Sequence, residues 1–150
     1  DRATSHTDWR LTRLHLGHDL PFVACNDIQF EQVFINLCNN ACDAMEQSKE
    51  RILMIQSMAE GDEVVVRVSD TGTGMRPEVQ ERIFESFFTT KSSAKSTGLR
   101  MSISQNIVEQ HKGQIRFNSE LGRGTTFEIY LPEPVDKDQL QSFWADGQIF

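Results

Sequence analysis

Apolar residues recur at three- and four-residue steps between Phe30 and Met45, and this spacing predicts an amphipathic helix. The apolar face comprises Phe30, Val33, Phe34, Leu37, Ala41, Ala44 and Met45. A second stripe at the same steps is polar and comprises Gln29, Gln32, Asn36, Asn40 and Asp43. Carboxamides are mediocre helix formers, so this stripe is unlike an ordinary solvated face of lysine and glutamate. From the helix alone two interpretations stay open: the stripe bonds neighbouring loops, or its oxygens are ligands for a metal ion.

The remainder of the chain predicts one sheet and two more helices. Alternating or β-branched runs predict strands over residues 10–17, 22–25, 51–59, 63–69, 114–119 and 125–131. Pro77 favours the first turn of a short helix that we expect to end near Ile83. Apolar spacing predicts a longer helix from Leu99 to His111. This element order predicts an α+β fold in two layers, with one sheet covered on one face.

An acidic residue, Asp70, stands where a buried strand ends, and Gly72 and Gly74 follow it. Glycine permits a positive φ and lets a ligand approach the backbone closely. A carboxylate in this position suits a hydrogen bond from an exocyclic amine such as that of adenine. Asp-Gly pairs also make plain turns, so the pattern is weak by itself. It gains weight from the carboxamide-bearing helix that precedes it.

Four motifs follow one another along the chain. They are Asn36-x-x-x-Asn40-Ala41, Asp70-x-Gly72-x-Gly74, Ile83-Phe84-Glu85-x-Phe87-Phe88-Thr89-Thr90-Lys91 and Thr97-Gly98-Leu99. In this order they resemble the N, G1, F and G2 boxes of the catalytic, ATP-binding domain of bacterial sensor histidine kinases. The phrasing is most similar to kinases of the nitrogen-regulator and dicarboxylate-sensor type, and the resemblance covers roughly residues 11–132.

The resemblance implies the Bergerat-type fold that these kinases share with gyrase, the MutL repair proteins and a heat-shock chaperone. We therefore expect a mixed, mostly antiparallel sheet covered on one face by three helices. The catalytic and ATP-binding domain is expected over residues 1–132, and its residues 1–10 are expected to be the end of a linker. Residues 133–150 are expected to be a C-terminal tail.

The resemblance also implies the site, which would hold ATP and Mg²⁺. Asp70 would take the adenine amino group, and Gly72 and Gly74 would lie beside the base. Asn36 and Asn40 would face the phosphates, with Asn40 as the Mg²⁺ ligand. Further contacts are expected from Asp43, Lys91, Thr97, Gly98, Leu99, Thr125 and Thr126. Lys91 would share the catalytic role with Asn36 and Asn40. Two alternative interpretations stay open: Lys91 is a solvated loop lysine, and the two threonines are ordinary strand residues.

Asn36 separates two enzyme classes within the resemblance. Gyrase-like ATPases carry a glutamate one turn before the metal asparagine, and this glutamate activates water. A carboxamide such as Asn36 cannot act as a general base. The resemblance thus favours a protein-histidine kinase. The phosphate acceptor would be a histidine in a separate helical hairpin, because none of the four histidines in this chain lies in a plausible acceptor helix.

The fourth motif departs from the family pattern, which usually reads G-x-G-T-G-L-G-L-S. Here the stretch from Ala94 to Ser102 reads AKSTGLRMS, so that Gly98 is the glycine that remains and Arg100 replaces another. Arginine adds bulk near the phosphates but is also a good phosphate partner. We expect the bulk to dominate, weakening ATP more than ADP. Two functions stay open: a histidine kinase domain with a variant lid, or a nucleotide-weak domain that acts as a regulatory scaffold.

The length and the net charge of the chain limit the kinds of partner that it can bind. The 150 residues suffice for one domain with a core, and the net charge of −7 argues against a general nucleic-acid or anionic-membrane surface. We expect no nucleic-acid partner and no direct membrane contact by this segment. The resemblance implies a cytoplasmic domain of a membrane-bound bacterial sensor. Its partners would be the phosphoacceptor hairpin, through which the kinase forms a homodimer, and a downstream response regulator.

Overall fold

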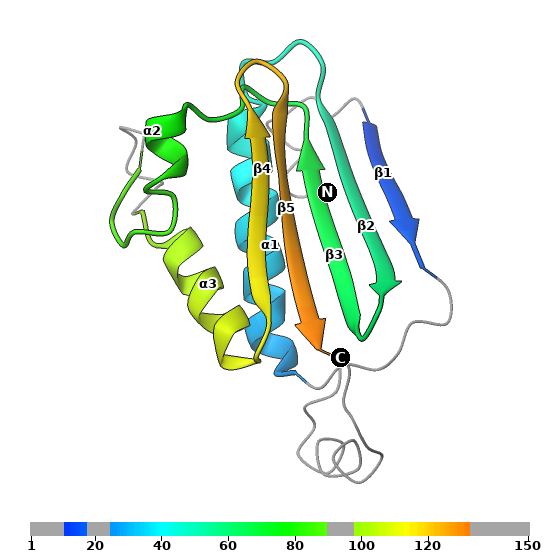
Figure 1. Cartoon of the computed structure of the whole chain (residues 1–150). Coiled ribbons are helices and arrows are strands. Elements are labelled where there is room, and N and C mark those ends of the chain that lie inside the picture. Colours follow the sequence, from blue (N-terminus) through cyan, green and yellow to red (C-terminus); the bar gives the residue numbers. More distant parts are fainter. Residues whose placement is uncertain (1–10, 18–24, 90–97, 133–150) are drawn as a thin grey trace, which may run out of the picture.

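The computed structural model describes residues 11–17, 25–89 and 98–132, which form a sheet with helices on one face (Figure 1). The strands are β1 (Leu11–Leu16), β2 (Ile52–Glu60), β3 (Glu63–Asp70), β4 (Gln114–Glu120) and β5 (Gly124–Pro132). The helices are α1 (Asp27–Ala44), α2 (Pro77–Gln80) and α3 (Arg100–Gln110). The predicted α+β sandwich is confirmed, and each strand expected wholly within the described residues is present within one or two residues of its predicted bounds.

The five strands lie in the order β1-β2-β3-β5-β4. The β1 strand pairs with β2 in parallel, and the other neighbours are antiparallel, as expected for a mixed, mostly antiparallel sheet. The last strand in sequence, β5, is inserted between β3 and β4. In this register Asp70 pairs with Thr125, so the end of β3 and the start of β5 meet at one edge of the domain.

The core forms where α1 packs on the inner face of the sheet. Phe30 and Val33 of α1 are fully buried, and α1 contacts β3 and β5. The side chains that meet them include Val68 and Ile129. Burying a side chain of this size stabilises the fold by roughly 1.5–3 kcal/mol. The predicted apolar face of the first helix is confirmed, and the Asn26 side chain caps this helix by accepting from Gln29 N at 3.0 Å.

The second helix is shorter than its sequence predicts. It ends at Gln80, and the chain continues in turns through the aromatic run that follows. Phe87 has a positive φ of 68°, and its N–H donates to Gly98 O at 2.8 Å. This reversal is incompatible with a continuing helix. Among the described residues, the layer on the sheet is therefore made mainly by α1 and α3, which also contact each other.

Two other expected features differ or lie outside the described residues. The third helix begins at Arg100, with Leu99 as its N-cap, one residue later than predicted. Of the strand expected over residues 22–25, only Cys25 is described, and it is buried but in no strand. Residues 1–10 and the tail expected over 133–150 also lie outside the described residues.

Replacing Gly124 by alanine tests the junction of β3 and β5. Gly124 has a φ of 134°, and a Cβ there would lie 2.0 Å from Asp70 O. Neither the backbone nor the sheet can absorb this contact cheaply, so Gly124→Ala should lower the free energy of unfolding by about 3 kcal/mol or more. Urea denaturation measures the loss.

Gly122 supplies the matched control in the same turn. It has a φ of 84°, but a Cβ there meets nothing within 4 Å. Gly122→Ala should cost only the conformational penalty, about 1–2 kcal/mol. Equal losses in the two variants would show that the close contact with Asp70 does not constrain the sheet.

Candidate functional site

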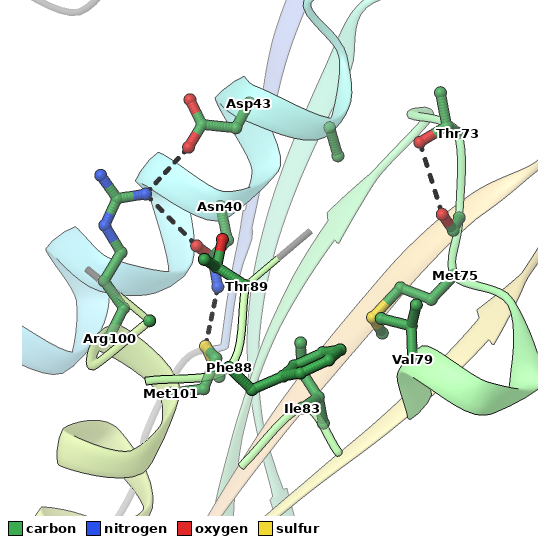
Figure 2. Close-up of a pocket in the computed structure, with 13 residues that line it drawn as sticks. Asn40, Asp43, Thr73, Met75, Val79, Ile83, Phe88, Thr89, Arg100 and Met101 are labelled. Carbon is green, nitrogen blue, oxygen red and sulfur yellow. Dashed lines mark hydrogen bonds and ion pairs between the residues drawn. The ribbon is translucent and has the colours of Figure 1, made fainter. Parts of the chain in front are cut away.

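A cleft of about 290 Å³ lies between α1, the start of α3 and the loops after β3 and α2 (Figure 2). Its apolar part is lined by Met75, Val79, Ile83 and Phe88. Its polar part is lined by side chains from two helices, Asn40 and Asp43 of α1 and Arg100 of α3, as Figure 2 shows. A mostly apolar cleft with a few convergent polar groups is typical of small-molecule sites, although this volume is at the lower end of their range.

The loop after β3 is held between α1 and the turn that joins β4 to β5. Thr73 N donates to Ala44 O at 3.1 Å, and Gly122 N donates to Thr73 O at 2.7 Å. A Cβ on Gly72 would lie 2.5 Å from Ala44 O, so only glycine permits this approach. Gly74 lines the cleft, whereas Gly72 holds the loop against the end of α1.

Asp70 has one carboxylate oxygen that is bonded and one that is not. Oδ1 accepts from Gly72 N at 2.8 Å and from Thr125 N at 3.3 Å. Within the described residues Oδ2 accepts no hydrogen bond. Burial raises the pKa of Asp70 to about 6, against the lowering effect of the two backbone N–H groups. A half-buried carboxylate with a free oxygen fits an amino group as its missing donor.

Asp70 and the two candidate threonines do not line the cleft itself. They line a separate hollow, which also includes Arg67, Asn118 and Glu128 of the sheet. Thr125 supports Asp70 through its backbone N–H, while its hydroxyl lies 2.8 Å from Ser119 Oγ. The Thr126 hydroxyl lies 2.9 Å from Ser69 Oγ. Of the two candidate threonines, Thr125 is thus the one that contacts Asp70 within the described residues, while the Thr126 hydroxyl is paired with Ser69.

The carboxamide stripe of α1 divides into two parts. Asn36 is only 4% exposed, and its Nδ2 donates to Arg100 O at 3.2 Å and to Ser104 Oγ at 3.1 Å. Its Oδ1 accepts from Gln32 Nε2 at 2.9 Å. It thus joins α1 to α3 and does not line the cleft, whereas Asn40 does. The stripe therefore bonds a neighbouring element at Asn36 and lines the cleft at Asn40, and the expected place of Asn36 facing the phosphates is not seen.

The partner of Arg100 could not be predicted from spacing, since it is 57 residues away. Arg100 Nη1 donates to Asp43 Oδ2 at 2.9 Å and lies 3.4 Å from Asn40 Oδ1 (Figure 2). The Asn40 amide nitrogen donates in turn to Met101 Sδ at 2.8 Å. This network turns the Asn40 oxygen towards a cation that the chain itself provides. Arg100 is therefore held in the wall of the cleft by the helix opposite.

These contacts do not fit a magnesium ion on Asn40. The described residues contain no group of three or more His, Cys, Asp or Glu side chains that could hold a metal. The oxygen expected to bind the metal already faces the Arg100 guanidinium. Unit charges of like sign about 4 Å apart repel by roughly 4 kcal/mol near a protein surface, and a divalent ion would double this. Arg100 and the metal cannot share this position.

The remaining predicted contacts lie at or beyond the edge of the described residues. Gly98 lines the cleft with a φ of 75°, and a Cβ there would lie 2.4 Å from the carbonyl carbon of Phe87. Leu99 caps α3 without a side-chain bond. Lys91 and Thr97 lie outside the described residues.

Comparison with known proteins decides the family. Residues 25–135 match the family described as "Histidine kinase-, DNA gyrase B-, and HSP90-like ATPase". The chain belongs to this family. Within it, the chain is the ATP-binding catalytic domain of the kind found in sensor histidine kinases, which confirms the resemblance of the four motifs.

Three similar proteins illustrate this ATP-binding domain. The chain is 42% identical to sensor kinase CckA of Brucella abortus over 81% of its own length, but it spans 14% of that relative. The catalytic domain of histidine kinase ThkA in a nucleotide-free form has a TM-score of 0.70 and 30% identity, covering 82% of this chain and 79% of that one. Full-length ShkA in complex with AMPPNP has a TM-score of 0.70 and 26% sequence identity. The match covers 82% of this chain and 26% of the ShkA chain.

Alanine at Asn36 and at Asn40 should separate the two parts of the stripe. Asn36→Ala leaves buried polar groups of α3 unpaired and should cost about 1–3 kcal/mol of folding free energy. Asn40→Ala should cost less stability and weaken nucleotide binding more, because Asn40 lines the cleft. Urea denaturation and calorimetric titration with ADP measure the two effects. A loss of binding without a loss of stability in Asn36→Ala would contradict the structural role.

Replacing Asp70 by asparagine should abolish nucleotide binding and leave the fold intact. The carboxylate would accept from an adenine amine, whereas the amide can turn a donor towards it. Removing a buried charge should leave the free energy of unfolding at pH 7 unchanged or higher. Thermal shift with and without ATP measures both. Undiminished stabilisation of the variant by ATP would show that Asp70 does not hold the base.

The same variant isolates the pH dependence of Asp70. Between its ordinary pKa of 3.8 and about 6, the folded chain keeps a proton that the unfolded chain has lost. The stability of the wild type relative to Asp70→Asn should therefore fall as pH rises from 4 to 7, by at most about 3 kcal/mol. ATP affinity should fall as pH drops below about 6, because protonated Asp70 cannot accept at both oxygens.

Proposed function

We propose that this domain transfers the γ-phosphate of ATP to a histidine on a separate helical hairpin, as one step of two-component signalling. The observation that carries the proposal is Asp70, whose Oδ2 accepts no hydrogen bond within the described residues. It precedes a loop whose Thr73 and Gly74 line the cleft that holds Asn40 and a cation. An amine-binding carboxylate at one side and a cationic wall at the other suit a nucleotide. Phosphoryl transfer needs little more than such positioning and charge neutralisation.

The nucleotide would lie along the cleft. Its base would lie beside Asp70 and the Gly72–Gly74 loop, with the apolar lining of Met75 and Ile83 against it. The phosphates would then point to the polar part, where Asn40 and Arg100 lie. This placement leaves the γ-phosphate at the open side, where a second domain can present its histidine.

Asn36 supports transfer to a protein over hydrolysis. Its amide nitrogen donates to Arg100 O and to Ser104 Oγ, so the position requires a donor. A carboxylate in its place would face the Arg100 carbonyl as one acceptor against another. The local structure therefore disfavours the water-activating glutamate of the hydrolases, and a carboxamide cannot replace it as a base.

The partners proposed are those of a sensor kinase. The acceptor hairpin would join two copies of the kinase, and a response regulator would take the phosphate from it. We propose that the domain works on the cytoplasmic side of a membrane-bound sensor. In 11–17, 25–89 and 98–132 no helix has the length and apolar character needed to cross a bilayer.

A regulatory scaffold is the second candidate. It is favoured by Arg100, which replaces a glycine of the family pattern and lies against the oxygen expected to bind Mg²⁺. Such a domain would dock on partners without turning over ATP. Failure of the wild type and of its Arg100 variants to bind ADP or ATP would favour this candidate.

Labelled ATP tests the kinase activity. The isolated chain should neither label itself nor hydrolyse ATP at rates near about 1 per second, which dedicated enzymes reach. Mixing it with the histidine hairpin of the sensor kinase that carries it should label the hairpin. The same hairpin with its histidine replaced by alanine is the control. Label on this chain itself, or none on the intact hairpin, would contradict the proposal.

A further inference from the structure

Within the part of the chain that the structure describes, two of the three nitrogens of the Arg100 side chain have no hydrogen-bond partner. Both of its hydrogen bonds to side chains, to Asp43 Oδ2 and Asn40 Oδ1, are made by Nη1. Within the described residues Nε and Nη2 donate to nothing. Figure 2 shows Nη1 turned towards α1 and the other two nitrogens turned away from it. The guanidinium is thus anchored by one nitrogen and presents a free edge.

This free edge has the geometry that binds phosphate. The N–H groups of Nε and Nη2 are parallel on one side of the planar guanidinium, which is the arrangement for a bidentate bond to two phosphate oxygens. The side chain is 25% exposed, so its charge is partly shielded from water yet reachable by a ligand. Its anchoring to Asp43 fixes the fork in advance, so that binding orders little more of the side chain.

The anchoring also alters the balance between bulk and charge. An arginine projecting freely into the cleft would crowd the phosphates. Here Asp43 and Asn40 hold the guanidinium against α1, and the cleft keeps a volume of about 290 Å³. The contacts therefore favour Arg100 as a ligand over Arg100 as an obstacle.

We propose that Arg100 is the resident cation of this cleft and binds the phosphates of a nucleoside di- or triphosphate directly, in the place of a divalent ion. The proposal rests on the proposed nucleotide site. It accounts for three features of the site: the Asn40 oxygen faces Arg100, Asp43 orients the guanidinium, and the other edge of the guanidinium is open within the described residues. A metal on Asn40 would have to displace Arg100 from both partners.

Calorimetric titration of the whole chain with ADP and with ATP, each in EDTA and in excess Mg²⁺, tests the proposal. Wild-type affinity should differ by less than about threefold between the two buffers. Arg100→Met keeps the length of the side chain and removes its charge, and in EDTA it should bind at least about tenfold more weakly. Arg100→Lys should regain part of the loss, since it keeps the charge without the fork.

Arg116→Met is the matched control. Arg116 lies over the Tyr130 ring at 4.5 Å and is not among the residues that line the cleft, so its loss should leave both affinities unchanged. Thermal unfolding without nucleotide shows that each variant is folded. A wild type that requires Mg²⁺ by about tenfold or more would overturn the proposal.

Two further outcomes separate this proposal from the proposed function. If Arg100→Met or Arg100→Gly binds ATP more tightly than the wild type, Arg100 is an obstacle; the proposal fails and the nucleotide site stands. If neither the wild type nor any folded Arg100 variant binds ADP or ATP in either buffer, the nucleotide site itself fails, and the role of Arg100 with it.

Discussion

The amide nitrogen of Asn36 donates to the Arg100 carbonyl at 3.2 Å and to the Ser104 hydroxyl at 3.1 Å, across the interface of α1 and α3. This buried contact fixes where α3 begins relative to α1. It also fixes the backbone of Arg100, whose side chain donates a hydrogen bond to Asp43 of α1. A buried amide with its partners satisfied specifies an arrangement, because any shift leaves costly unpaired groups. The polar part of the cleft depends on this one carboxamide.

The other side of the cleft depends on the meeting of β3 and β5. Asp70 accepts from Gly72 N and Thr125 N, so a single carboxylate oxygen connects the loop after β3 to the start of β5. The loop is also bonded to the end of α1 through Thr73 and Ala44. Two helices and two strand ends thus form one connected frame. The unbonded oxygen of Asp70 is the part of this frame left for a ligand.

Periodicity predicted the elements well because burial decides them. Phe30 and Val33 lie on an apolar helix face that must be buried against the sheet. β-branched residues such as Val64 and Val68 belong to the same buried cluster and form a strand of that sheet. The order of the four motifs also predicted the family, because the motifs contain residues that come together in the fold. Spacing could not show that Asn36 faces a second helix while Asn40 faces a cleft, because both lie on one polar stripe.

Other features depend on contacts that no local pattern encodes. The Phe87 N–H donates to Gly98 O and so joins two residues that are distant along the chain, beyond the turns that follow α2. The pairing of Arg100 with Asp43 joins two helices that are distant in sequence. The sequence could not show which of Thr125 and Thr126 contacts Asp70, because the contact is made by a backbone N–H and depends on the register of β5 against β3. The expectation that Arg100 crowds the phosphates was made from the bulk of arginine alone, because the sequence does not show that Asp43 of the opposing helix anchors the side chain.

Arg100, a side chain of this protein, supplies the positive charge that the nucleotide phosphates need. A crystal structure with AMPPNP and Mn²⁺, with anomalous scattering recorded for manganese, tests this claim most directly. The account predicts phosphate oxygens within hydrogen-bonding distance of Arg100 Nε and Nη2, and no anomalous peak at Asn40 Oδ1. A manganese peak on Asn40, with Arg100 displaced from Asp43 and away from the phosphates, would contradict it.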